Sequence, residues 1–299
     1  MVLENPKSYR GEKIVLQPQS ISEKLMYSTI RLSIGSSTAT GFFYELDTPR
    51  KTVIVISNRH FAEQVDNLSK LDFSKSSIIQ QTQFLIHLDD GTNKQICENV
   101  EWFLHPSEDL AFFVLEKALS NHPLPMNVKY FVLRVTPNMI PTQTQLNNLT
   151  ALENVVMVRY PNGLYDTVNN YPLFRTGKTA THPAIDYNGK KKALLDMSCL
   201  PGSSGSPVFI LDEGWIHHKS GGMSAGSCIF FLGVENSMPT RHSKSVYKKV
   251  VLPDGKISYN QTDEYIVEDD MKLGYYIKSS EISGFNTQIQ NLGCSSQEK

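Results

Sequence analysis

The stretch CLPGSSGSPVF, residues 199–209, places five consecutive Gly and Ser residues between two apolar segments. A strand interior disfavours such a run, because glycine and serine offer little side chain for packing against neighbouring strands. A linker would not end abruptly in Pro207 and the apolar residues that follow it. The segment therefore predicts a tight turn that holds a functional group and then releases the chain into a strand.

Serine chemistry gives this turn a candidate role. A serine hydroxyl is a weak nucleophile unless a base takes its proton and hydrogen-bond donors hold the oxyanion that forms. Gly202 can adopt φ values closed to other residues, which lets the amides of Gly202 and Ser204 point into one small concavity. Ser204 is therefore the candidate nucleophile, and these two amides are the candidate oxyanion hole.

A base and an acid occur in two further segments. In VIVISNRHFA, residues 53–62, an apolar strand ends at Ser57 and His60 follows three residues later. In HPSEDLAFFVL, residues 105–115, Asp109 stands directly before a strand that the apolar run predicts to be buried. Each residue alone has an ordinary structural explanation. Together with Ser204 they favour a catalytic triad, because a desolvated acid can orient the imidazole that activates the serine.

Strands are predicted along most of the chain, which favours an all-β sandwich or barrel. A polar stretch at 137–153 is the candidate connection between a first unit, 1–136, and a second, 154–299. Ile282, Phe285, Ile289 and Leu292 stand at helical spacing and predict a short amphipathic C-terminal helix. The predicted strands cover residues 28–34, 40–46, 52–57, 84–88, 111–115, 155–158, 207–211, 229–234 and 275–277.

Composition excludes several other classes of protein. The net charge is −1 over 299 residues and the Lys and Arg residues are scattered, so the chain lacks the clustered positive charge that binds nucleic acid or an anionic membrane. It has no run of 18 apolar residues and no apolar signal-peptide segment, so a cytoplasmic location is expected. The four cysteines form no CxxC pair, so we expect buried small hydrophobic residues rather than a metal site or disulfides. No cofactor is predicted.

Several segments resemble trypsin-like serine peptidases of the chymotrypsin fold. VISNRHFA (55–62), EDLAFFVL (108–115) and PGSSGSPVF (201–209) are similar to the segments around that family's histidine, aspartate and serine. TATGFFYEL (38–46) and FFLGVENS (230–237) resemble the strand before the histidine and the strand after the nucleophile. The resemblance spans roughly residues 25–280 and is nearest to the bacterial intracellular and HtrA-like branch, whose members share a segment similar to RYPNGLYD (159–166).

This resemblance implies two six-stranded antiparallel β-barrels and a short C-terminal helix, with the active site between the barrels. His60 and Asp109 would come from the first barrel and Ser204 from the second. His60 would act first as general base and then as general acid, while Asp109 fixes its tautomer. The implied activity is hydrolysis of protein or peptide substrates through an acyl-enzyme.

Two departures from the family bear on regulation. Digestive members carry an aspartate directly before the nucleophile, which pairs with a newly cut N-terminus; this chain has Ser203 there, so no such zymogen switch is expected. Phe61 replaces a half-cystine of secreted members, in agreement with a reducing compartment. Control is expected from a regulatory protein partner, an oligomeric gate or the loop 212–227.

The sequence indicates the residues of the primary specificity pocket less clearly than those of the triad. Ser198 stands six residues before the nucleophile, where a neutral hydroxyl argues against a salt bridge to a substrate Arg or Lys. Gly233 and Glu235 lie in the strand expected to form one wall, and alternation over six residues does not settle which face Glu235 takes. A Glu235 side chain in the pocket would favour Arg or Lys at the cleaved position, whereas one in solvent would leave Ser198 and apolar residues to select an uncharged side chain. Between these we favour the uncharged preference, because an unpaired buried carboxylate is costly. Asn236 is expected near Asp109.

The sequence therefore predicts a serine endopeptidase, by family analogy a regulated intracellular bacterial enzyme with a stress or defence role. A peptide-binding pseudoprotease is the alternative, and esterase activity at the same site is a third.

Overall fold

The computed structural model describes residues 17–161, 165–199, 202–252, 257–285 and 288–289. Its first half closes into a six-stranded barrel with the order β1-β2-β3-β6-β5-β4, in which all neighbouring strands are antiparallel. The strands are β1 (Thr29–Ile34), β2 (Ser37–Glu45), β3 (Val53–Ser57), β4 (Ser77–His87), β5 (Asn93–Leu104) and β6 (Ala111–Val114).

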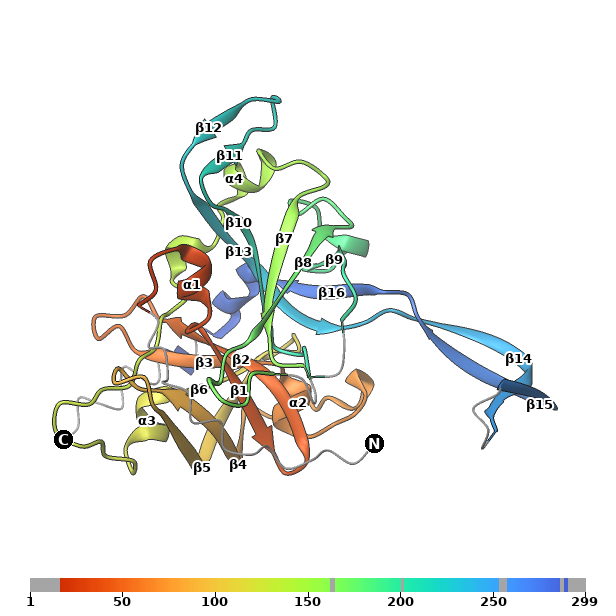
Figure 1. Cartoon of the computed structure of the whole chain (residues 1–299), viewed down its shortest axis with the longest axis horizontal. Helices are drawn as coiled ribbons and strands as arrows, with labels where there is room; N and C mark the ends of the chain where they lie inside the picture. The colour runs from red at the N-terminus through yellow and green to blue at the C-terminus, as the bar shows by residue number, and fades with distance from the viewer. Residues whose placement is uncertain (1–16, 162–164, 200–201, 253–256, 286–287, 290–299) are drawn as a thin grey trace.

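A second closed, antiparallel barrel has the order β10-β13-β16-β9-β8-β7. The two barrels lie one above the other in Figure 1. This confirms the predicted fold class, the two-barrel architecture of chymotrypsin-like proteases. The strands are β7 (Asn154–Arg159), β8 (Leu173–Thr179), β9 (Lys192–Asp196), β10 (Pro207–Asp212), β13 (Cys228–Ser237) and β16 (Leu273–Lys278).

Two hairpins project from the second barrel. The loop expected at 212–227 forms a short hairpin of β11 (Trp215–His217) and β12 (Met223–Ala225). Between β13 and β16 the chain leaves the barrel in a long hairpin of β14 (Thr240–Val251) and β15 (Ile257–Asp270), which extends far to one side (Figure 1). Strand prediction from the sequence missed this second hairpin.

The helices are all short. The segment 137–153, which we predicted as the connection between the barrels, carries η2 and α4. The predicted C-terminal helix is described in part: residues Ser279–Phe285 form the 3₁₀ helix η4, in which Ile282 and Phe285 are buried, residues 288–289 are α-helical, and Leu292 lies outside the described residues. The helices are α1 (Ile21–Leu25), α2 (Arg59–Glu63), α3 (Leu115–Leu119), α4 (Gln143–Asn147), η1 (Leu68–Lys70), η2 (Pro137–Met139), η3 (Tyr187–Gly189) and η4 (Ser279–Phe285).

A hydrophobic cluster joins the two barrels and fixes how they face each other. The Phe231 ring lies 5.2 Å from Phe42 of the first barrel and 5.5 Å from Phe209 of the second, measured between ring centroids. All three side chains are fully buried. Truncating such a ring to alanine typically costs about 3–5 kcal/mol, so the cluster holds the relative position of the barrels firmly.

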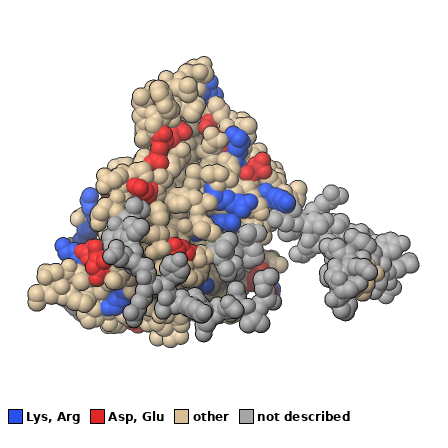
Figure 2. All heavy atoms as spheres, in the orientation of Figure 1, with Lys and Arg blue, Asp and Glu red and all other residues tan. Residues whose placement is uncertain are grey.

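The surface charge, the helices and the cysteines agree only in part with the expectations from the sequence. Basic and acidic side chains are interspersed over the face shown in Figure 2. Among the described helices, none has the length and apolar character needed to cross a membrane. The expectation of buried cysteines is wrong for Cys97, which is exposed; Cys199 is buried and Cys228 half-buried. Cys294 lies outside the described residues.

Candidate active site

His60 and Asp109 meet as the sequence predicted. β3 pairs with β6 so that Ser57 stands opposite Ala111, which brings the residues just beyond one strand next to those just before the other. The His60 Nδ1 lies 2.8 Å from the Asp109 Oδ2, and the His60 amide donates to Oδ1 at 2.8 Å. Both carboxylate oxygens are therefore engaged by one residue.

The surroundings of this pair hold it rigidly. Asp109 is only 3% exposed, and its backbone carbonyl accepts a hydrogen bond from the Asn58 side chain at 2.8 Å. Burial lowers the pKa of His60, but the Asp109 carboxylate outweighs it, so the pKa is raised overall. A carboxylate at Nδ1 favours the tautomer with its proton there, which leaves Nε2 as the proton acceptor.

The glycine-rich turn has the positive φ at Gly202 that its sequence predicted. Gly202 and Gly205 take φ values of 89° and 85°, in the region that favours glycine, and the Ser206 amide donates to the Ser203 carbonyl at 2.9 Å. A Cβ on Gly205 would lie 2.1 Å from the Thr40 carbonyl oxygen. Glycine is therefore required at Gly205 because the backbone of the first barrel comes too close for any side chain.

Thr40 of the first barrel holds the turn from one side. Its amide donates to the Ser204 carbonyl at 3.0 Å, and its hydroxyl donates to the Gly202 carbonyl at 3.1 Å. The Thr40 carbonyl in turn accepts from the Ser57 hydroxyl at 2.8 Å, at the end of the strand that leads to His60. These contacts dock the Ser204 turn on the edge of the first barrel from which His60 arises.

The hydroxyl of Ser204 does not hydrogen-bond to the His60 imidazole in the described part of the chain. Such bonds are often long in unliganded sites and tighten when substrate binds. The structure thus brings His60 and Asp109 together and places the Ser204 turn against the same edge, while the complete triad stays a prediction. The oxyanion-hole amides of Gly202 and Ser204 likewise stay a prediction, and Leu200 and Pro201 before them lie outside the described residues.

Arg159, at the end of β7, contacts the turn at Ser203. Prediction from the sequence missed this residue. Its side chain is buried, with the residue 4% exposed, and Nη1 donates to the Ser203 hydroxyl at 2.5 Å. Ser203 is itself fully buried. The segment RYPNGLYD was identified only as a family resemblance, and nothing in it indicates that Arg159 points inward.

Glu235 corrects the expectation that its side chain faces solvent. It is 2% exposed, and its backbone clamps the turn, since its amide donates to the Ser206 carbonyl at 2.9 Å and its carbonyl accepts from the Gly205 amide at 3.0 Å. The carboxyl Oε2 is buried without a hydrogen-bond partner. Burial raises the pKa of Glu235 to about 7, against the opposing effects of the Cys199 thiol, His60 and Arg159. Glu235 is therefore coupled electrostatically to the candidate base.

The other predicted pocket residues are Ser198, between β9 and β10, and Gly233 and Asn236, both on β13. Ser198 is half-buried. Gly233 approaches β16 so closely that a Cβ would lie 1.9 Å from the Ile277 carbonyl oxygen, so glycine is needed there for strand packing. Asn236 is 2% exposed and accepts from the Ser237 hydroxyl at 3.3 Å. No hydrogen bond joins Asn236 to Asp109 among the residues that the structure describes.

Comparison with known proteins gives likenesses of structure alone. No family model matches the chain, and no curated protein matches it. The M. tuberculosis protein Rv3671c, in an inactive form, is similar at 14% identity and a TM-score of 0.44, with 91% of this chain and 90% of that chain covered. The structure of Deg5 is similar at 15% identity and a TM-score of 0.41, covering 72% and 81%.

A Glu endopeptidase structure is similar at 12% identity and a TM-score of 0.36, covering 88% of this chain and 90% of that one. Likenesses at this level assign neither an activity nor a substrate to this chain.

Proposed function

We propose that this protein is a serine endopeptidase whose triad is His60, Asp109 and Ser204. The observation that carries the proposal is the His60–Asp109 pair, in which a buried carboxylate engages both the imidazole Nδ1 and the backbone amide of the same histidine. The docking of the Ser204 turn on that edge of the first barrel supports it.

In this mechanism Ser204 Oγ attacks the carbonyl carbon of the scissile peptide bond while His60 Nε2 takes the hydroxyl proton. The amides of Gly202 and Ser204 stabilise the resulting oxyanion, a contribution typically worth about 3 kcal/mol for one donor. His60 then gives its proton to the leaving amine, and water hydrolyses the acyl-enzyme by the reverse sequence of proton transfers. Asp109 stays ionised throughout and stabilises the imidazolium.

The support of the turn bears on how the activity is controlled. The Arg159 guanidinium donates to the Ser203 hydroxyl and belongs to the same chain as the nucleophile. In zymogens of the resembled family, a newly cut N-terminus supplies the positive charge at this position. We therefore propose an enzyme that needs no activating cleavage. Its substrates are proteins or peptides, its control comes from a regulatory protein partner, and it acts in the bacterial cytoplasm, with a stress or defence role by family analogy.

For the primary pocket we propose a preference for an uncharged substrate residue. Glu235 is buried, but it lies within the electrostatic reach of Arg159, and its raised pKa leaves it partly protonated near neutrality. The neutral Ser198 hydroxyl supplies no charge. Peptides varied at the cleaved position, tested on wild type and on Glu235→Gln, check this; strong selectivity for Arg or Lys that collapses in the variant would contradict it.

One observation favours the alternative, a peptide-binding pseudoprotease: Ser204 and His60 are not hydrogen-bonded to each other in the described structure. A fluorophosphonate probe separates the two, because it forms a covalent bond only with an activated serine. The proposal expects labelling of Ser204 in the wild type, none in Ser204→Ala, and cleavage of a peptide library. Peptide binding without labelling or cleavage would establish the pseudoprotease, and cleavage of esters alone would establish an esterase.

A further inference from the structure

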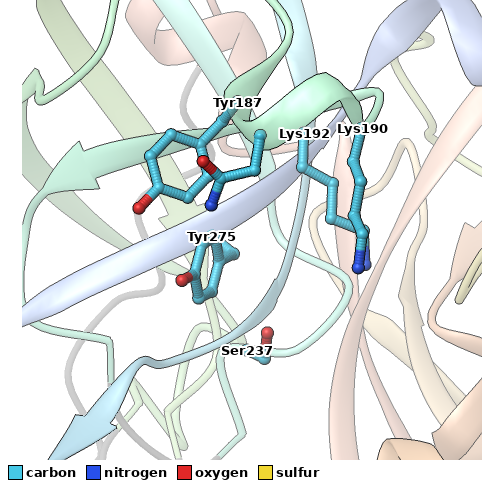
Figure 3. Close-up of a pocket in the computed structure, with 6 residues that line it drawn as sticks. Tyr187, Lys190, Lys192, Ser237 and Tyr275 are labelled. Carbon is cyan, nitrogen blue, oxygen red and sulfur yellow. The ribbon is translucent and has the colours of Figure 1, made fainter.

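A small pocket on the second barrel is lined by polar side chains (Figure 3). Its volume is about 210 Å³, below the 300–1,000 Å³ typical of small-molecule sites, so it suits a single side chain better than a whole ligand. Figure 3 shows the side chains of Lys190 and Lys192 running down the same side of the pocket. The pocket is lined by Tyr187, Asn188, Lys190, Lys192, Ser237 and Tyr275.

One contact and one strand position relate this pocket to the candidate catalytic residues. Lys192 Nζ lies 3.8 Å from the carboxylate of Glu108, which directly precedes Asp109 in the chain. Ser237 is the last residue of β13 and stands two residues beyond Glu235, the residue that clamps the Ser204 turn. The pocket therefore lies within a few residues' reach of the bond that Ser204 would cleave.

Strand β13 ends beside the pocket. β10 pairs with β13 as far as Val234, the Glu235 backbone then binds the Ser204 turn, and Ser237 pairs with Tyr275 on the other side. Extended peptides commonly bind by adding a strand to a free sheet edge, with pockets for alternate side chains giving specificity. Such pairing is open only beyond Glu235, and a substrate bound there would pass over the pocket.

Positive charge in the pocket is incompletely balanced. Lys191 forms a 2.7 Å ion pair with Asp186, which also pairs with Lys278. Lys192 has only the long contact with Glu108, and Lys190 has no ion pair among the described residues. The two ammonium groups of Lys190 and Lys192 thus have the single carboxylate of Glu108 near them, and Glu108 does not line the pocket.

We propose that this pocket is a substrate subsite that binds the carboxylate side chain of an Asp or Glu residue near the scissile bond. Lys190 and Lys192 would supply the charge, and the Tyr187 and Tyr275 hydroxyls would supply further donors. The inference rests on the proposed peptidase function and adds to it a preference for acidic residues at one position outside the primary pocket. That position lies within about four residues of the cleaved bond, a span of about 13 Å in an extended chain.

The test compares kcat/KM for pairs of peptides that differ only by Glu or Gln, at each of four positions on either side of the cleaved bond. We expect Glu to be preferred at one position, by about two- to fivefold for each lysine, as for partly exposed ion pairs. Lys190→Gln and Lys192→Gln each reduce the preference, and high salt weakens it. Lys191→Gln is the matched control, because it removes the same charge outside the pocket and keeps the preference.

A binding measurement separates failure of this inference from failure of the proposed function. Fluorescence anisotropy of the same labelled peptides with Ser204→Ala measures the pocket without any turnover. If the wild type cleaves no peptide but the lysine-dependent preference for Glu appears in binding, the subsite stands and the peptidase proposal falls. Equal values for Glu and Gln at every position in both measurements overturn the subsite, as does a preference that survives in the Lys190→Gln, Lys192→Gln double variant.

Discussion

Replacement of Glu235 by glutamine should change how the stability of the protein depends on pH. Burial raises the pKa of this carboxyl from 4.5 to about 7 in the folded protein, whereas the unfolded chain has the ordinary value. Between these values the folded state keeps a proton that the unfolded state has released. The folded state is therefore favoured below pH 4.5, and the advantage is lost as pH rises towards 7.

The size of this effect follows from the two pKa values. A difference of about 2.5 units corresponds to about 3 kcal/mol of free energy of unfolding, lost by the wild type between pH 4.5 and pH 8. Glutamine does not titrate, so the variant lacks this loss. We expect Glu235→Gln to gain about 3 kcal/mol relative to wild type over that range, equivalent to a relative rise of about 5 °C in Tm.

The assay is urea unfolding of both proteins at half-unit pH intervals, read as the difference in unfolding free energy between them. Taking this difference cancels the titration of groups that do not interact with Glu235, such as Glu108, whereas His60 is coupled to Glu235 and its pKa shifts in the variant. Any fixed effect of the substitution shifts the difference equally at all pH values. Parallel stability curves from pH 4.5 to 8 would show that Glu235 has an ordinary pKa and is not held in a desolvated site.

Three further outcomes are expected. Ser204→Ala and His60→Ala should each lower kcat by about 10⁴-fold because a triad acts as a unit, and more than a tenth of wild-type activity in either would refute the assignment. Arg159→Met should lower kcat/KM by about 10- to 100-fold, the equivalent of losing a charge-assisted hydrogen bond of about 1.5–3 kcal/mol, and full activity at unchanged Tm would contradict its role. Mass spectrometry of active enzyme should find the chain uncleaved, whereas activity only after cleavage would argue against an internal support of the turn.

Prediction from the sequence succeeded where a local signal coincided with strand pairing. His60 and Asp109 stand at the ends of two apolar runs, and those runs pair in the register that brings the two residues together. The glycine-rich turn was recognisable because its composition suits only unusual backbone angles. In both cases the signal lies in a few residues that are adjacent in the sequence, although His60 and Asp109 meet only through the pairing of β3 with β6.

The remaining features depend on contacts between distant residues. The alternation of apolar and polar residues could not show which face of the strand Glu235 takes, because the pairing of β13 with β16 shifts register directly after Glu235. Arg159 was overlooked because arginine is rarely buried, and its partner Ser203 follows much later in the chain. The 3₁₀ form of η4 was missed because a spacing of three residues, as between Ile282 and Phe285, suits both helix types.

The support of the Ser204 turn has a consequence for biosynthesis. The turn is held by Thr40 from the first barrel, by Arg159 through Ser203, and by Glu235 from a strand that follows the turn in the chain. Because Glu235 is the last of the three to be translated, a nascent or truncated chain that ends before β13 presents the serine on a loop that lacks the Glu235 clamp. Under the proposed function, such fragments cannot cleave neighbouring proteins at the ribosome, and proteolytic competence coincides with completion of the second barrel.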